Sequence, residues 1–229
     1  MNESAIHNNK DIIFSLISKS KKLLLSVKEA NRYEDMSSAK NRMEQQVVIK
    51  NICENCRSAL DYCFYYINND YSLGIDEKQI YFPFSYKSSI FIKIDIVKAI
   101  KIHNEKLYNY LYSMQPFVPG GNYWWLKRFI ELNNKYKHQG FIPLKPFFKT
   151  KTFGWTQFGD IGISVEEFSF NVTENKIPVE KIDFKSDRTI EFEFRLEDNK
   201  TSVVNYMNMV LEGIEQIINN IFMMIESTN

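Results

Sequence analysis

Two sets of polar residues in this 229-residue sequence have the types and the spacing that chemistry on a phosphate group would need. In the first set, Arg57 and Asp61 are four residues apart, so on a helix they share one face and can pair. The second set is spaced by three, four and three residues and consists of Arg128, Glu131, Lys135 and His138. Each set therefore gathers side chains that could act on one ligand.

His138 is the member of these sets whose charge can change near neutral pH. Neighbouring cations disfavour a second positive charge, so they lower the pKa of a histidine and leave it able to accept a proton. Arg57 could hold a phosphate through a forked pair of hydrogen bonds, and Asn134 and Lys135 could orient the substrate. Metal-independent RNA cleavage needs these parts: a base for the 2′-hydroxyl group and a cation for the phosphate in its transition state.

Both sets also have a purely structural interpretation. Arg57 and Asp61 would then form an ion pair on a solvated helix face, where such a pair contributes about 0.2–0.5 kcal/mol. Lys137 and His138 would lie in the last turn of a helix and stabilise the negative end of its dipole. The residue types leave both interpretations open.

Four short motifs, in this order and spacing, resemble a group of uncharacterised bacterial proteins. Those proteins have an Asn-x-Arg-Ser-Ala-Leu-Asp-His helix and a later Asn-x-x-Lys-His-Arg stretch. The corresponding motifs here are Asn-Cys-Arg-Ser-Ala-Leu-Asp-Tyr at 55–62, Tyr-Phe-Pro at 81–83, Met-Gln-Pro-Phe at 114–117 and Leu-Asn-Asn-Lys-Tyr-Lys-His at 132–138. The resemblance covers roughly residues 45 to 145.

That bacterial group is similar in outline to the HEPN superfamily of helical proteins, many of which are metal-independent ribonucleases of toxin–antitoxin and antiviral systems. Their active motif is an arginine followed, four to six residues later, by a histidine, and it is usually assembled across a dimer. The resemblance implies that Arg57 supplies the arginine, but Tyr62 stands where the histidine is expected. Tyrosine, with a pKa of about 10, is a poor base at neutral pH. Either His138 supplies the missing function, or the chain does not cleave RNA.

Apolar periodicity predicts the elements that must position these residues. We expect about five helices, at 9–33, 38–69, 89–114, 123–137 and 202–225. Asn122 is a plausible N-cap for the fourth helix, and Gly140 is expected to end it. Around Pro83 the sequence predicts an irregular connector pinned by aromatic residues.

The segment from 145 to 198 has a different character, rich in Phe, Thr, Val and Ile. Residues 189–196 alternate strictly between apolar and charged, which is typical of a half-buried antiparallel strand. The predicted fold class is therefore α+β. It is a mostly helical bundle, from 9–140 and 202–226, with a small antiparallel β-sheet inserted at about 145–198. We expect one domain over residues 1–229.

Cys53, Cys56 and Cys63 belong to the apolar seam of the second predicted helix. This spacing favours small core residues over a metal or redox site, because no second cysteine pair and no nearby histidine accompany them. We therefore expect no metal and no cofactor.

The composition is that of an ordinary globular protein, with 44% hydrophobic and 25% charged residues. A net charge of +1 is too small for a chain-wide nucleic-acid or membrane signal. No apolar run approaches the roughly 20 residues of a membrane span, and the first residues do not resemble a signal peptide. The expected location is the cytoplasm, without a membrane partner.

These patterns leave two hypotheses about function. The first is a non-catalytic helical protein that binds RNA, a nucleotide or a protein partner and is linked to bacterial defence. The second is a HEPN-like ribonuclease of a toxin or antiphage system, a homodimer in which Arg57 and His138 are catalytic. In either case the expected substrate-binding residues are Tyr62, Asp61, Arg128, Asn134 and Lys135.

Overall fold

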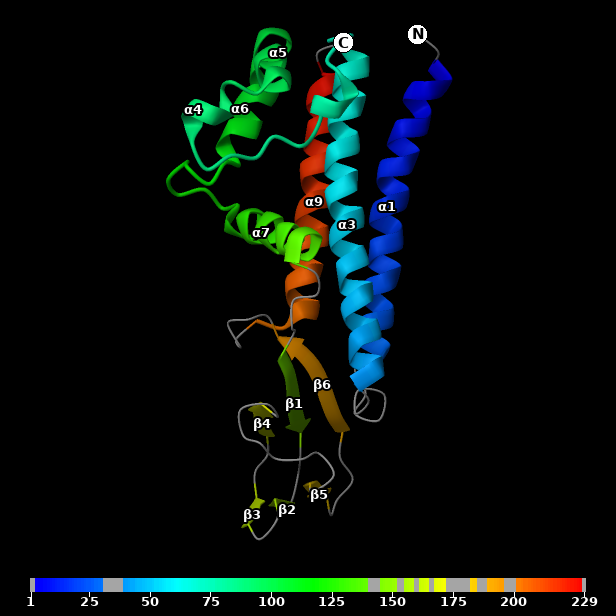
Figure 1. Cartoon of the computed structure of the whole chain (residues 1–229), viewed down its shortest axis with the longest axis vertical. Coiled ribbons are helices and arrows are strands. Elements are labelled where there is room, and N and C mark those ends of the chain that lie inside the picture. The colour runs from blue at the N-terminus through cyan, green and yellow to red at the C-terminus, as the bar shows by residue number, and fades with distance from the viewer. Residues whose placement is uncertain are drawn as a thin grey trace. The chain divides into compact units, whose positions relative to one another are not determined.

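The computed structural model describes residues 3–30, 39–139, 145–151, 155–158, 161–164, 167–171, 182–184, 189–195 and 201–227 (Figure 1). The chain forms two compact units. One consists of Met1–Lys22, Asn51–His138 and Met209–Asn229, and the other of Leu23–Lys50 and Gln139–Asn208. We call the first of these the helical unit. The described chain is mostly helical, which confirms that part of the predicted fold, whereas the single domain stays a prediction.

Three long helices contribute to the helical unit: α1 (Glu3–Ala30), α3 (Ala39–Asp70) and α9 (Val203–Glu226). Their ends in this unit lie side by side (Figure 1). Lys10 of α1 pairs with Glu226 of α9 at 2.7 Å, and Lys21 pairs with Glu215 at 2.7 Å. Since the residue number rises on α1 as it falls on α9, these two helices are antiparallel.

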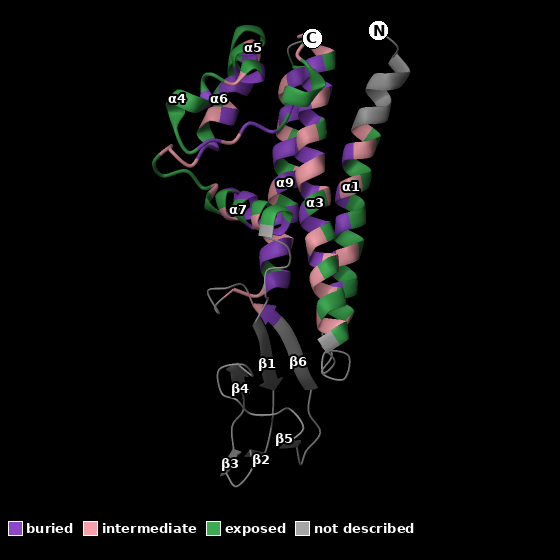
Figure 2. Ribbon diagram, viewed as in Figure 1, coloured by how far each residue is buried: buried purple, intermediate pink, exposed green. Residues whose placement is uncertain are grey.

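Apolar stripes hold these three helices together (Figure 2). The stripe of α9 recurs at helical spacing, and its fully or almost fully buried members include Val210, Ile214, Ile217, Ile218 and Ile221. On α3 the buried seam consists of Cys53, Cys56, Leu60, Cys63 and Ile67, each 0% exposed. The prediction that the three cysteines are core residues is therefore confirmed.

Burial of the cysteine thiols should make them unreactive in the folded protein. Desolvation raises the pKa of Cys56 to about 12 and raises the pKa of Cys53 and Cys63 above the ordinary value of 9.0. Only the thiolate attacks an alkylating reagent, and a higher pKa leaves less thiolate at a given pH. At about pH 8 we expect iodoacetamide to label the native protein at least about a thousandfold more slowly than the urea-unfolded chain.

Mass spectrometry of the labelled protein over time measures both rates. The native rate should also rise with pH, because the thiolate fraction grows as pH approaches the raised pKa. A native rate within about tenfold of the unfolded rate would show that these thiols are accessible.

The prediction of a single helix at 89–114 is wrong. The chain there forms three helices: α4 (Ser88–Phe91), α5 (Asp95–His103) and α6 (Glu105–Ser113). Asn104 breaks the last two apart with φ −151° and ψ 89°, and its side chain accepts a hydrogen bond from the N–H of Leu107. Asn104 is an N-cap, a role for which asparagine is strongly preferred.

An irregular connector around Pro83 is present, as predicted, and Gln115 anchors it. The Gln115 side chain is 2% exposed. Its Oε1 accepts from the N–H of Ser85 at 2.9 Å, and its Nε2 donates to the carbonyl of Pro83 at 3.1 Å. Nε2 also donates to the carbonyl of Leu111 at 2.9 Å. One buried amide therefore ties the end of α6 to the connector.

Helix α7 (Trp124–Gln139) packs on α9 at a glycine. A Cβ added at Gly213 would overlap the indole of Trp125, with Cη2 only 2.6 Å away. Trp125 is 8% exposed, so the missing side chain of Gly213 makes room for this ring. The predicted fourth helix is thus present, and Gly140, its expected end, lies outside the described residues.

The second unit contains six short strands. They are β1 (Lys145–Lys151), β2 (Trp155–Phe158), β3 (Ile161–Ser164), β4 (Glu167–Asn171), β5 (Ile182–Phe184) and β6 (Thr189–Arg195). Strand β1 pairs antiparallel with β4 and β6, and β2 pairs antiparallel with β3 and β5. The pairings form two separate groups, so the prediction of one small inserted sheet is not confirmed.

Within the described stretches, no helix combines the length and the apolar character needed to cross a bilayer.

Candidate functional site

Arg57 and Asp61 of α3 form a forked ion pair in the helical unit. Arg57 Nε lies 3.2 Å from Asp61 Oδ2, and Arg57 Nη2 lies 3.1 Å from Asp61 Oδ1. The two side chains are 21% and 29% exposed, so the pair is mostly buried rather than solvated. A two-point contact of this kind fixes both side chains more firmly than a single surface contact.

The ion pair also clamps the backbone of the connector at Phe82. Asp61 Oδ1 accepts from the N–H of Phe82 at 2.8 Å, and Arg57 Nη2 donates to the carbonyl of Phe82 at 3.4 Å. The guanidinium carbon lies 5.9 Å from the centre of the Phe82 ring. Burial raises the pKa of the Asp61 carboxyl above its ordinary value of 3.8, although Arg57 and the N–H of Phe82 act in the opposite direction. The pair therefore positions the connector against α3.

Beside this clamp lies a cavity of about 410 Å³, which we call the α3–α7 pocket. Its lining comes from α3, the connector and α7: Arg57, Asp61, Tyr81, Phe82, Phe84, Tyr86, Ile130, Asn133, Asn134 and Lys137. The four residues from α7 follow the spacing i, i+3, i+4 and i+7, which is one face of a helix. Helical geometry thus explains why two amides and one cation meet here.

Asn133 is the unusual member of this lining. It is 7% exposed, and no group within the described part of the chain donates a hydrogen bond to its side-chain oxygen Oδ1. A buried polar atom without a partner costs about 1–3 kcal/mol. Such atoms are rare in folded proteins and call for an explanation, of which a binding role is one.

Aromatic side chains of the connector form a part of the lining that we call the aromatic wall. Tyr81 and Tyr86 are 42% and 53% exposed, and the rings of Phe84 and Tyr86 meet edge to face at 5.6 Å. The hydroxyl of Tyr86 donates to Glu131 Oε1 at 2.9 Å. Desolvation, followed by this carboxylate, raises the pKa of Tyr86 to about 12, so the phenol keeps its proton. The wall thus offers neutral ring faces.

The structure brings three of the expected site residues into this pocket: Arg57, Asp61 and Asn134. Tyr62 lies on α3 in the lining of a second cavity, which it shares with Asp61. Neither cavity is lined by the remaining expected residues, Arg128, Lys135 and His138. His138 is exposed in the last turn of α7. Basic residues in the last turn of a helix stabilise the negative end of its dipole.

Sequence reasoning overlooked Asn133, Lys137 and the connector rings as site residues. The polar face was assigned to 128, 131, 135 and 138, whereas the pocket uses 130, 133, 134 and 137. Each residue turns a helix by about 100°, so these two faces are neighbours. The i, i+3, i+4, i+7 spacing of Ile130, Asn133, Asn134 and Lys137 was the available signal.

The pocket combines ring faces, amides and cationic groups, which are the means by which proteins hold planar anionic molecules. Among the residues that the structure describes, no cluster of three or more His, Cys, Asp or Glu side chains could hold a metal ion. No protein-family model, curated protein or solved structure matches this chain.

Proposed function

We propose that this chain is a non-catalytic binding protein whose α3–α7 pocket takes a planar organic anion, namely a nucleotide or one nucleotide of single-stranded RNA. The observation that carries this proposal is the buried Oδ1 of Asn133 in the lining of the pocket, which accepts no hydrogen bond from any residue that the structure describes. A ligand that offers a hydrogen-bond donor, once the amide turns toward it, would remove the cost of leaving that atom unpaired.

The other lining residues suit the same ligand class. The exposed rings of Tyr81 and Tyr86 provide stacking faces for a nucleobase, and base stacking on an aromatic ring contributes about 1–3 kcal/mol. Lys137 is exposed at the rim, where an ammonium group can meet a phosphate. Arg57 adds positive charge, but its Nε and Nη2 are already engaged by Asp61 and Phe82.

The surroundings of Arg57 and His138 support binding over cleavage. A HEPN-like ribonuclease would need both side chains at one phosphate. Arg57 is instead held by a carboxylate, Tyr62 stands at the expected histidine position, and His138 lies outside the pocket lining. The alternative keeps one supporting observation, since His138 directly follows Lys137, which does line the pocket. A defence role and a homodimer both come with the HEPN resemblance and are further proposals.

Calorimetric titration with AMP and with a short single-stranded RNA tests the binding proposal. We expect Lys137→Ala and Asn133→Leu each to weaken binding by about tenfold, because they remove the phosphate contact and the amide. Lys106→Ala, which removes an exposed lysine from α6, is the matched control and should bind as the wild type does. Binding that is absent, or equal in all four proteins, would refute the proposal.

RNA integrity in the same samples tests the alternative. A binding protein leaves the RNA intact in the wild type and in His138→Ala. Cleavage by the wild type that disappears in both Arg57→Ala and His138→Ala would instead establish the ribonuclease.

A further inference from the structure

We infer that the second cavity, on the Tyr62 side of α3, is a binding site for an organic cation that carries a primary ammonium or guanidinium group. We call it the Tyr62 pocket. The inference stands on this cavity alone and does not rest on the function proposed for the α3–α7 pocket.

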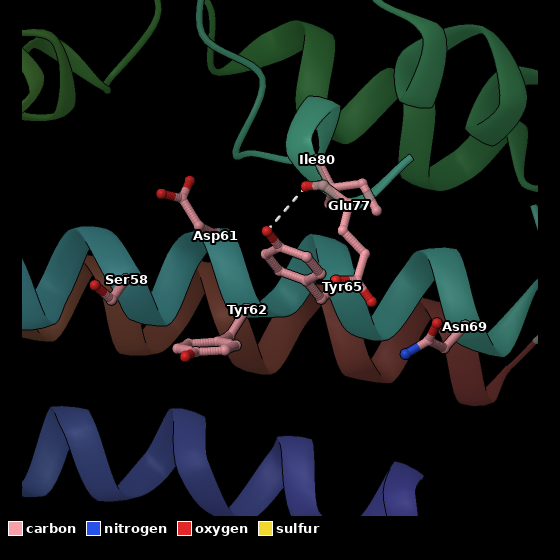
Figure 3. Close-up of a pocket in the computed structure, with 7 residues that line it drawn as sticks. All are labelled: Ser58, Asp61, Tyr62, Tyr65, Asn69, Glu77 and Ile80. Carbon is pink, nitrogen blue, oxygen red and sulfur yellow. Dashed lines mark hydrogen bonds between the residues drawn. The ribbon is translucent and has the colours of Figure 1, made fainter. Parts of the chain in front are cut away.

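The Tyr62 pocket has a volume of about 510 Å³ and lies between α3 and the 3-10 helix η1 (Glu77–Gln79) with the residue after it (Figure 3). Its lining is formed by Ser58, Asp61, Tyr62, Tyr65, Asn69, Glu77 and Ile80. The five residues from α3 follow helical spacing and project from one side of that helix (Figure 3). The site is therefore built from one helix face and one crossing segment.

The charge of this lining has one sign. Asp61 and Glu77 contribute two carboxylates, and none of the described residues that line the cavity is a lysine, arginine or histidine. Asp61 is paired with Arg57, whereas Glu77 forms no ion pair with any described residue. A cation entering the pocket would thus meet the carboxylates of Glu77 and Asp61.

Two tyrosine rings complete the chemistry of a cation site. The rings of Tyr62 and Tyr65 lie 5.9 Å apart with an interplanar angle of 44°, and Tyr62 is 37% exposed. A cation within about 6 Å of a tyrosine ring is attracted by the negative face of that ring. The combination of ring faces with carboxylates favours an organic cation over Ca²⁺, which takes about six to eight oxygen ligands.

Tyr65 is held in place, so its ring is a fixed wall of the site. Its hydroxyl donates to the backbone carbonyl of Glu77 at 2.9 Å, which ties α3 to η1 (Figure 3). Desolvation and then the charge of Glu77 and Asp61 raise the pKa of Tyr65 above 10.0. The tyrosine stays protonated beside two negative charges, and the same charges stabilise a bound cation.

The cation has two natural sources, a free polyamine and a lysine side chain of a partner protein. Calorimetric titration with spermidine represents the first, and titration with the peptide N-acetyl-Gly-Lys-Gly-amide represents the second. The same peptide with norleucine in place of lysine removes only the charge. Tighter binding of spermidine assigns the site to polyamines, and tighter binding of the lysine peptide assigns it to a protein partner.

Glu77→Gln and Tyr62→Ala test whether either probe binds in this pocket. We expect each variant to weaken binding by about threefold and the double variant by about tenfold. Tyr62→Phe keeps the ring and should bind as the wild type does. Glu44→Gln removes an exposed carboxylate elsewhere on α3 and serves as the charge-matched control. Circular dichroism verifies that every variant is folded.

Two outcomes would overturn the inference. One is that neither probe binds at millimolar concentration. The other is binding that Glu77→Gln and Tyr62→Ala leave unchanged, or that Glu44→Gln weakens equally, because spermidine would then be binding to negative surface charge in general. If the wild type binds the cation probes but no nucleotide, only the function proposed for the α3–α7 pocket is refuted.

Discussion

Replacing Gln115 with leucine is expected to lower the free energy of unfolding by about 3 kcal/mol. Leucine is close to glutamine in size but can form none of the three hydrogen bonds that this buried side chain makes. The N–H of Ser85 and the carbonyl of Pro83 would then lose their partner inside the protein. Each buried group left unsatisfied costs about 1–3 kcal/mol. Urea unfolding followed by circular dichroism measures the change.

Gln79→Leu is the matched control, since Gln79 is an exposed glutamine on η1. Its stability should stay within about 0.5 kcal/mol of the wild type. Gln115→Leu should also weaken nucleotide binding, because the connector that Gln115 anchors carries the aromatic wall of the α3–α7 pocket. A stability loss no larger than that of Gln79→Leu would show that this amide does not hold the connector.

Replacing Asp61 with alanine is expected to cost about 2–3 kcal/mol of stability. The substitution leaves the Arg57 guanidinium, whose side chain is 21% exposed, without its carboxylate, and leaves the N–H of Phe82 without its acceptor. Asp61→Asn removes the charge but keeps an oxygen for Phe82, so it should lose less. The same urea unfolding experiment compares the two variants.

An exposed pair on α5 provides the control for Asp61. Asp95 lies 2.6 Å from Lys98, but the side chain of Asp95 is 61% exposed and that of Lys98 is 53% exposed. Asp95→Ala should therefore change stability by about 0.5 kcal/mol or less. In an Arg57→Met background, Asp61→Ala should cost less than half of what it costs in the wild type. Equal costs in both backgrounds would mean that the pair does not contribute to stability.

Asp61 links the two candidate sites because it lines both cavities. The α3–α7 pocket has Arg57 and Lys137 in its wall, and the Tyr62 pocket has Glu77. Helix α3 thus lines two cavities that differ in their other charged residues and share one carboxylate. Variants of Asp61 should impair binding in both, whereas Lys137→Ala and Glu77→Gln should each affect one.

The long helices could be read from the sequence because burial imposes a period on their apolar residues. Helix α9 repeats isoleucine and valine at helical spacing, and α3 places its cysteines on a seam of steps of three and four. The break at Asn104 was missed because apolar residues continue on both sides of it. An asparagine followed by Glu105 is nevertheless a recognisable N-cap signal.

The sequence by itself determined that Arg57 and Asp61 would pair, since residues four apart on a helix are neighbours wherever that helix lies. Only the tertiary structure decided that this pair would be largely buried and bonded to Phe82. Phe82 lies 21 positions from Asp61 and 25 positions from Arg57 in the sequence. The tertiary structure also decided which face of α7 lines the pocket. Helical period relates residues within one helix, but it carries no information about which neighbour covers a face. Polar side chains occur on two adjacent faces of α7, and packing against α3 and the connector selected Asn133, Asn134 and Lys137 over His138.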